Sequence, residues 1–220
     1  LWKNQTGNQN TAIGDYAMKQ FRADGGTYNT AVGRSSQRGP NSDSDYYSGS
    51  YNTSVGSGSL KVITTGDDNT AVGYYSQYGN SITGDKNSSL GSNSLKDLIG
   101  GSGNNAIGYN AAQNITNGNY NVSIGNNSSN ANQTGDDNVA IGNSALYSNT
   151  SNDNTAVGFN ALYNNNAANN VGIGWKAGNE ITSGTDNVVI GYNASVGTAT
   201  ANNQIVIGSG VTGSGVNTAV

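Results

Sequence analysis

Two pairs of adjacent carboxylates are the residues of this sequence whose type and spacing could do chemistry. They are Asp67–Asp68 and Asp136–Asp137. Paired acids can hold a divalent cation or act as a general acid and a general base. Both pairs follow a glycine in nearly the same phrase, GDDNTAVG and GDDNVAIG, 69 residues apart. A phrase that recurs along a chain is typical of a repeat architecture, so the repeat decides what these acids can do.

The composition excludes several kinds of site. The 220 residues include no Cys and no His, which removes disulfides, thiolate or imidazole metal sites and the commonest acid–base residue. A net charge of −4 gives no positive surface that would attract nucleic acid. The sequence has no apolar run of about 18 residues, the length that a membrane span needs. Only 33% of the residues are hydrophobic and only 10% are charged, which fits neither an ordinary globule nor a disordered chain. We therefore expect backbone hydrogen bonding in a regular stack to order the chain.

One glycine marks each copy of the repeat, and we call it the anchor glycine. It follows the aliphatic residue of phrases such as NTAVG, and its copies are 16 to 23 residues apart, most often 17. The twelve anchors are Gly14, Gly33, Gly56, Gly73, Gly91, Gly108, Gly125, Gly142, Gly158, Gly174, Gly191 and Gly208. The repeat predicts a single repetitive domain over residues 1–220, which we interpret as a segment of a longer chain.

Residues at fixed distances from the anchor form columns with distinct chemistry. The residue directly before the anchor is always aliphatic, and the residue two positions before it is small in ten of the twelve copies. The residue four positions before the anchor is Asn in eleven copies. The residue seven positions before it is Gly in nine copies, and we expect a turn with positive φ at this glycine. Two copies that show these structural columns contain Asn69, Val72 and Gly73, and Asn138, Ile141 and Gly142.

This pattern predicts an all-β fold, a parallel β-solenoid or β-roll of about twelve rungs of 16–23 residues, each with two short strands and two turns. The two acid pairs then lie four rungs apart, roughly 19 Å, and cannot share a reaction centre in one chain. We interpret them as turn residues. Asp137 and Asp153 share a column on adjacent rungs, but the repeat lacks the Gly-Gly-x-Gly-x-Asp pattern of calcium-binding rolls. We predict no catalytic residue, no metal site and no cofactor.

The Asn column has two interpretations. Asn side chains stacked at strand spacing can pass amide hydrogen bonds from rung to rung. Alternatively, Asn stands there only because it tolerates turns. We favour the amide ladder, because Asn in eleven of twelve copies is more regular than turn chemistry requires.

The two faces of the predicted strand differ. Residues one and three before the anchor share a face that becomes more apolar along the chain, from Thr70 to Val139 and Ile205. If the small-residue face closes the roll, the aliphatic face lies outside and needs a partner, which a closed homo-oligomer would supply. The alternative is that the aliphatic column fills the interior.

Aromatic residues and one long repeat are the candidates for partner contact. An aromatic residue directly follows the anchor in five copies, and the other copies have a polar residue there. We therefore expect the rings to face solvent as platforms for sugars or proteins. The alternative is that each ring covers the backbone of the neighbouring rung. The 23-residue step from Gly33 to Gly56 is expected to bulge as a recognition loop or a tolerated insertion. The candidates are Arg34, Arg38, Tyr46, Tyr47 and Tyr51 in this step, and Tyr74, Tyr109, Phe159, Trp175 and Tyr192 after anchors.

The phrases NTAIG, NTAVG, NSSLG, NNAIG, NVAIG and NVVIG, each followed by x-x-Ala/Ser, resemble the head repeats of YadA-type trimeric autotransporter adhesins. Similar repeats occur in fibres of bacteriophages and in other bacterial surface or secreted fibres. The resemblance covers the chain from about Gly7 to Val220. It implies a left-handed parallel β-roll, three chains wound into a trimer, and attachment or display instead of catalysis.

These observations predict a non-enzymatic extracellular fibre domain, an adhesin head or tail-fibre shaft on a cell surface or virion. Its expected partners are copies of itself in a homo-oligomer, a trimer by the resemblance, and a host surface glycan or protein. One alternative is a filament subunit whose rods stack end to end. A second alternative is an ice-binding solenoid, which needs a regular Thr array, but the Thr column ends after Thr70 apart from Thr155. A glycan-cleaving enzyme needs two carboxylates close together, whereas the acids of this chain are scattered.

Overall fold

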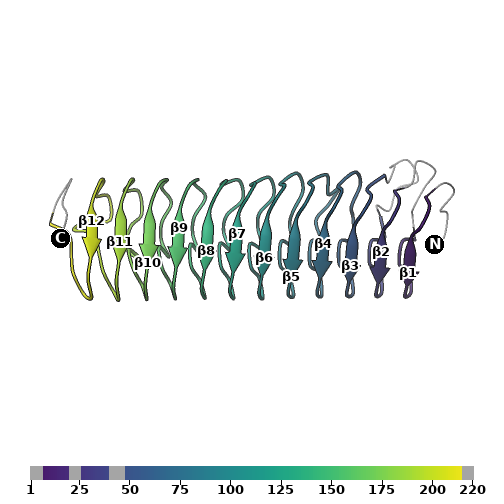
Figure 1. Cartoon of the computed structure of the whole chain (residues 1–220), viewed down its shortest axis with the longest axis horizontal. Helices are drawn as coiled ribbons and strands as arrows, with labels where there is room; N and C mark the ends of the chain where they lie inside the picture. Colours follow the sequence, from purple (N-terminus) through teal and green to yellow (C-terminus); the bar gives the residue numbers. More distant parts are fainter. Residues whose placement is uncertain (1–6, 20–25, 40–47, 215–220) are drawn as a thin grey trace.

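The computed structural model describes residues 7–19, 26–39 and 48–214. These residues form a parallel β-solenoid in which each rung gives one strand to a 12-stranded sheet, in the order of the sequence. The strands are β1 (Thr11–Ile13), β2 (Thr30–Val32), β3 (Thr53–Val55), β4 (Thr70–Val72), β5 (Ser88–Leu90), β6 (Asn105–Ile107), β7 (Val122–Ile124), β8 (Val139–Ile141), β9 (Thr155–Val157), β10 (Val171–Ile173), β11 (Val188–Ile190) and β12 (Ile205–Ile207). The rungs lie side by side along a straight rod from β1 to β12 (Figure 1). The predicted solenoid is therefore confirmed.

Equivalent residues of neighbouring rungs pair with each other. Ile124 is in register with Ile141, and Ser123 with Ala140. The register holds even across the longest step, where β2 and β3 pair residue for residue. The columns of the sequence are therefore columns in space, spaced at about 4.8 Å along the rod.

The expected second strand in each rung is absent from the described residues, so that part of the prediction is wrong. Outside the twelve strands, only isolated bridges occur, at Ile63–Ile82 and at Ser195–Thr212. The reason is the backbone after the anchor, where the residues two and four positions later are left-handed, as at Ser144 (φ 53°) and Leu146 (φ 50°). Two left-handed residues in three cannot extend as a strand, although their N–H groups still bond to the next rung.

Small residues and Asn line the interior of the roll. The middle residue of each strand from β2 onward is buried, as Ala140 is, and so is the Asn column. Side chains four and seven residues after the anchor fill the remaining space, among them Leu146, Leu162 and Ile181. The small-residue face therefore closes the roll, and the aliphatic column points outward.

Two sets of glycines allow neighbouring rungs to approach. The anchor Gly125 has φ +135°, and a Cβ there would lie 2.4 Å from the Gly142 carbonyl oxygen. The glycine seven before the anchor was expected to have positive φ, and this is wrong, as at Gly118. A Cβ on Gly118 would instead lie 2.6 Å from the Gly135 carbonyl oxygen, so close approach explains this glycine. Positive φ falls two residues later, as at Tyr120 (φ 56°).

The Asn column forms a continuous amide ladder, which confirms the favoured interpretation. The Asn104 Oδ1 accepts hydrogen bonds from the backbone N and the side-chain Nδ2 of Asn121, both at 3.0 Å. The Asn104 Nδ2 donates to the Gly118 carbonyl oxygen at 2.7 Å. The same backbone hydrogen bond recurs along the whole column. It runs from Asn29, whose backbone N donates to Asn10 Oδ1, to Gln204, whose backbone N donates to Asn187 Oδ1. Each buried amide therefore bonds its own rung to its neighbours.

Candidate functional site

The outward side of the sheet, which we call the strand face, is a candidate interaction surface. It consists of the residues one and three before each anchor, the first and last residue of every strand. Its aliphatic column stays open to solvent: Ile13 is 60% exposed, Leu90 51%, and Ile141, in the middle of the rod, 37%. A row of exposed and half-buried aliphatic side chains thus runs from β1 to β12.

The second column of the strand face changes chemistry along the rod. Threonines stand at its position in β1 to β4, Ser88 and Asn105 follow in β5 and β6, and Val or Ile stands in five of the last six strands. A shallow hollow of about 210 Å³ lies at this change, between Thr70, Ser88 and Asn105, with Leu90 and Ile107 in its lining. The strand face is therefore mixed over its first half and almost wholly apolar over its second.

Three of the predicted contact rings stack on one another along successive rungs. The centroids of Phe159 and Trp175 are 6.2 Å apart, and those of Trp175 and Tyr192 are 4.7 Å apart, with ring planes within 12° and 10°. All three rings are partly exposed, as are Tyr74 and Tyr109. Because stacked rings turn their faces toward each other, they present mainly edges to solvent. Of the five rings, only Tyr109 has no described ring stacked on it.

The stacked rings are expected to contribute to stability. Trp175→Ala removes both ring contacts, and each aromatic pair contributes about 0.5–1.5 kcal/mol beyond its buried area. We expect the free energy of unfolding to fall by about 1–3 kcal/mol, measured by urea denaturation. Tyr109→Ala, the matched control in the same column, should change it by less than about 0.5 kcal/mol. Equal effects of the two substitutions would show that stacking is not the cause.

Tyr74 belongs to a cluster of three rings on the rung of β4. Its ring centroid is 3.9 Å from that of Tyr75, which is 4.3 Å from that of Tyr78. Interaction with the Tyr75 side chain, chiefly by hydrogen bonding, raises the pKa of the Tyr74 phenol above its ordinary value. Gly58 on the preceding rung makes room for the cluster, because a Cβ there would lie 2.6 Å from the Tyr75 ring.

Three of the five candidates of the 23-residue step lie in the described residues, and each has a contact there. Arg34 is exposed, and its Nε lies 3.9 Å from Asp15 Oδ2 on the first rung. The Arg38 guanidinium lies over the Tyr16 ring, 5.8 Å from its centroid. Tyr51 stacks on Tyr28 with centroids 5.1 Å apart. Tyr46 and Tyr47 lie outside the described residues.

The acid pairs have structural partners. The Asp67 Oδ1 accepts a hydrogen bond from the backbone N of Ser50 at 2.7 Å, and the equivalent oxygen of Asp136 accepts one from Asn119 at 2.6 Å. Asp68 and Asp137 are left-handed, with φ of 58° and 56°. Asp68 and Asp137 thus lie at bends before β4 and β8, which agrees with the interpretation as turn residues. No group of three or more acids that could hold a metal ion occurs in the part of the chain that the structure describes.

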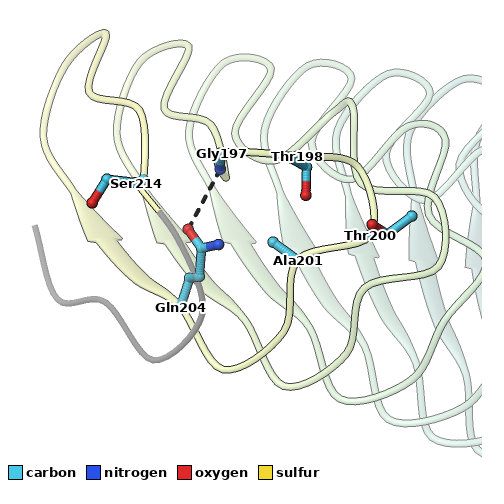
Figure 2. A pocket seen from close by; sticks show the side chains of 7 residues that line it. Gly197, Thr198, Thr200, Ala201, Gln204 and Ser214 are labelled. Carbon is cyan, nitrogen blue, oxygen red and sulfur yellow. Dashed lines mark hydrogen bonds between the residues drawn. The ribbon is translucent and has the colours of Figure 1, made fainter.

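A hollow of about 370 Å³ lies beside the last described rung. Figure 2 shows Gln204 reaching toward Gly197, whose backbone N donates to Gln204 Oε1 at 3.4 Å, with Thr198, Thr200 and Ser214 around it. The buried Gln204 Nε2 has no acceptor among the described residues. In most earlier rungs the Asn amide nitrogen at this place donates to a carbonyl oxygen of the following rung, as Asn187 does to Ala201. The hollow therefore lies at the last described step of the amide ladder.

Comparisons with protein-family models, with curated proteins and with solved structures find no match. The class that the fold defines is the parallel β-solenoid. Over residues 7–19, 26–39 and 48–214, no helix is long and apolar enough to cross a membrane. The function of the chain is therefore inferred from its own surfaces.

Proposed function

We propose that this chain is a non-enzymatic fibre domain that assembles with copies of itself through the strand face. The observation that supports this proposal is the exposed aliphatic column. Contiguous apolar patches larger than a few hundred Å² are rare on monomers and mark interaction sites. Burying one Val, Leu or Ile side chain contributes about 1.5–3 kcal/mol, and the column supplies such a residue at every rung.

The shape of the rod favours a closed assembly of parallel copies. A straight face with the same residue type at every rung can pack against other copies about an axis parallel to the rod, and such symmetry closes without leaving an apolar edge. The resemblance of the NTAVG phrases to YadA-type heads points to three copies and to left-handed winding. We propose a trimer on this basis.

The proposed role is attachment or display outside the cell, as an adhesin head or tail-fibre shaft on a cell surface or virion. The amide ladder supports it, because stability that accumulates rung by rung gives a rod that holds its surface side chains at fixed spacing. The partner of the displayed surface would be a host glycan or protein.

Charges on the strand face test the proposed assembly. Ile124→Asp combined with Ile141→Asp places two carboxylates in the middle of the aliphatic column, where burial without a partner is costly. We expect this variant to sediment as a monomer that remains folded, because neither side chain fills the interior of the roll. The wild type is expected to sediment as a trimer under the same conditions.

A matched control adds the same charges elsewhere. Asn126→Asp with Ser209→Asp changes two exposed residues that directly follow their anchors, and the trimer should persist. A wild type that sediments as a monomer, or a strand-face variant that assembles as the wild type does, would contradict the proposed assembly.

A further inference from the structure

The column five residues after the anchor was missed in the sequence, and it is basic in four of the first five rungs. It carries Lys19, Arg38, Lys61, Tyr78 and Lys96 in that order. Four of the nine Lys and Arg residues of an acidic chain thus stand in one column. Two of its members touch across adjacent rungs, where Lys61 Nζ donates to the Tyr78 hydroxyl at 2.6 Å. Such a cationic edge attracts anions.

A hollow of about 350 Å³ opens beside this column. The step from Gly73 to Gly91 is 18 residues, one longer than usual, and the extra length leaves Asn80 exposed at the rim. The lining comes from three successive rungs and consists of Tyr78, Gly79, Asn80, Lys96, Asp97, Ile99 and Thr116. None of these residues belongs to the strand face, so the proposed assembly does not use them.

The lining combines an apolar surface with several kinds of polar group. The Tyr78 ring contacts Lys61, whose Nζ lies 4.5 Å from the ring centroid, and the Tyr75 ring, which is tilted by 46° against it. Ile99 is 39% exposed, which is unusual for a large aliphatic residue outside the strand face. The Lys96 ammonium and the Asp97 carboxylate have no hydrogen-bond or ion-pair partner among the described residues, so both are free to bind a ligand.

We propose that this hollow, which we call the Tyr78–Lys96 site, binds a carboxylated sugar unit of an acidic glycan. A sugar ring can pack its C–H face against Tyr78 and Ile99 and offer hydroxyls to Asp97 and Asn80. Its carboxylate then pairs with Lys96. An acidic peptide fits less well, because it brings several carboxylates close to the carboxylate of Asp97. The further cations of the column lie along the rod, where the next units of a polyanionic glycan would run.

Titration calorimetry with a galacturonic acid oligosaccharide tests the site. The wild type should bind it, should not bind a neutral cello-oligosaccharide of equal length, and should lose affinity as salt is raised. Lys96→Gln should weaken binding about tenfold or more, because it removes a charged hydrogen-bonding partner. Tyr78→Ala should weaken it further by removing the ring.

The control uses a lysine outside the site. Lys176 Nζ lies 4.5 Å from the Trp175 centroid, so Lys176→Gln removes the same charge over an aromatic ring far along the rod, and binding should be unchanged. The site would be overturned if Lys96→Gln bound as tightly as the wild type, if Lys176→Gln weakened binding equally, or if the neutral oligosaccharide or a poly-glutamate peptide bound as well. Sedimentation of the same samples reports assembly separately, so a monomer that binds through Lys96 would refute the proposed trimer alone.

Discussion

Gly125→Ala is expected to lower the free energy of unfolding by about 3 kcal/mol or more, or to prevent the rungs of β7 and β8 from stacking. The added Cβ would lie 2.4 Å from the Gly142 carbonyl oxygen and 2.6 Å from its carbon. Both are backbone atoms, so no side chain can rotate away. The φ of +135° is also one that residues with a Cβ rarely adopt. Steric overlap and backbone strain therefore act together.

The measurement is urea denaturation followed by circular dichroism, with variants compared at one protein concentration because assembly stabilises the folded state. Gly210→Ala is the control, since Gly210 has φ +65° and no atom within 4 Å of the added Cβ. That substitution should cost only about 1 kcal/mol of left-handed strain. If Gly125→Ala cost no more than Gly210→Ala, the close approach of rungs at the anchor would be disproved.

Asn104→Ala is expected to cost about 3–5 kcal/mol, because it removes one step of the amide ladder inside the roll. The Asn121 backbone N and the Gly118 carbonyl oxygen would lose their side-chain partner. The Asn121 Nδ2 would lose one bond and keep those to the Asn119 and Gly135 carbonyl oxygens. A buried donor or acceptor left without a partner costs about 1–3 kcal/mol. The interior of the roll is packed, so water has no ready access to these groups.

Asn126→Ala makes the same change on an exposed residue whose side chain has no hydrogen bond among the described residues. Its effect on urea unfolding should be within about 0.5 kcal/mol. Hydrogen exchange adds a local measurement, since the backbone amide of Asn121 should lose protection in Asn104→Ala. Retained protection and unchanged stability would contradict the amide ladder. They would mean that Asn occupies this column only because it tolerates turns.

The solenoid, the register and the amide ladder were predictable because every rung meets a copy of itself. A residue such as Asn69 or Gly73 has the same neighbours as its equivalents, so the chemistry of a contact appears as a column in the sequence. The direction of the strand faces stayed open in the sequence, because both an interior of small residues and an interior of aliphatic residues agree with the alternation along each strand.

Features that depend on backbone conformation were not predictable in the same way. Leu146 and Leu162 are left-handed with φ of 50° and 48°, although leucine rarely adopts this conformation. The sequence alone therefore offered no sign that the second side of each rung is a series of turns. The glycine at Gly118 was assigned to a turn because steric contact between rungs leaves the same signature as positive φ.

The candidate contact residues were only partly predictable for a related reason. Position after the anchor indicated exposure, but the stacking of Trp175 on its neighbours depends on which rings follow one another on successive rungs. The Tyr78–Lys96 site depends on one extra residue in one rung, which looks like ordinary variation in repeat length. The column of cations was visible in the sequence, and aligning the fifth residue after each anchor would have found it.

The native mass of the intact wild-type protein tests the central claim most directly, namely that the exposed aliphatic column of the strand face is covered by copies of the same chain. Native mass spectrometry at micromolar concentration should give a single species of three times the 22.4 kDa chain mass. A species of 22.4 kDa that persists as the concentration is raised would contradict it.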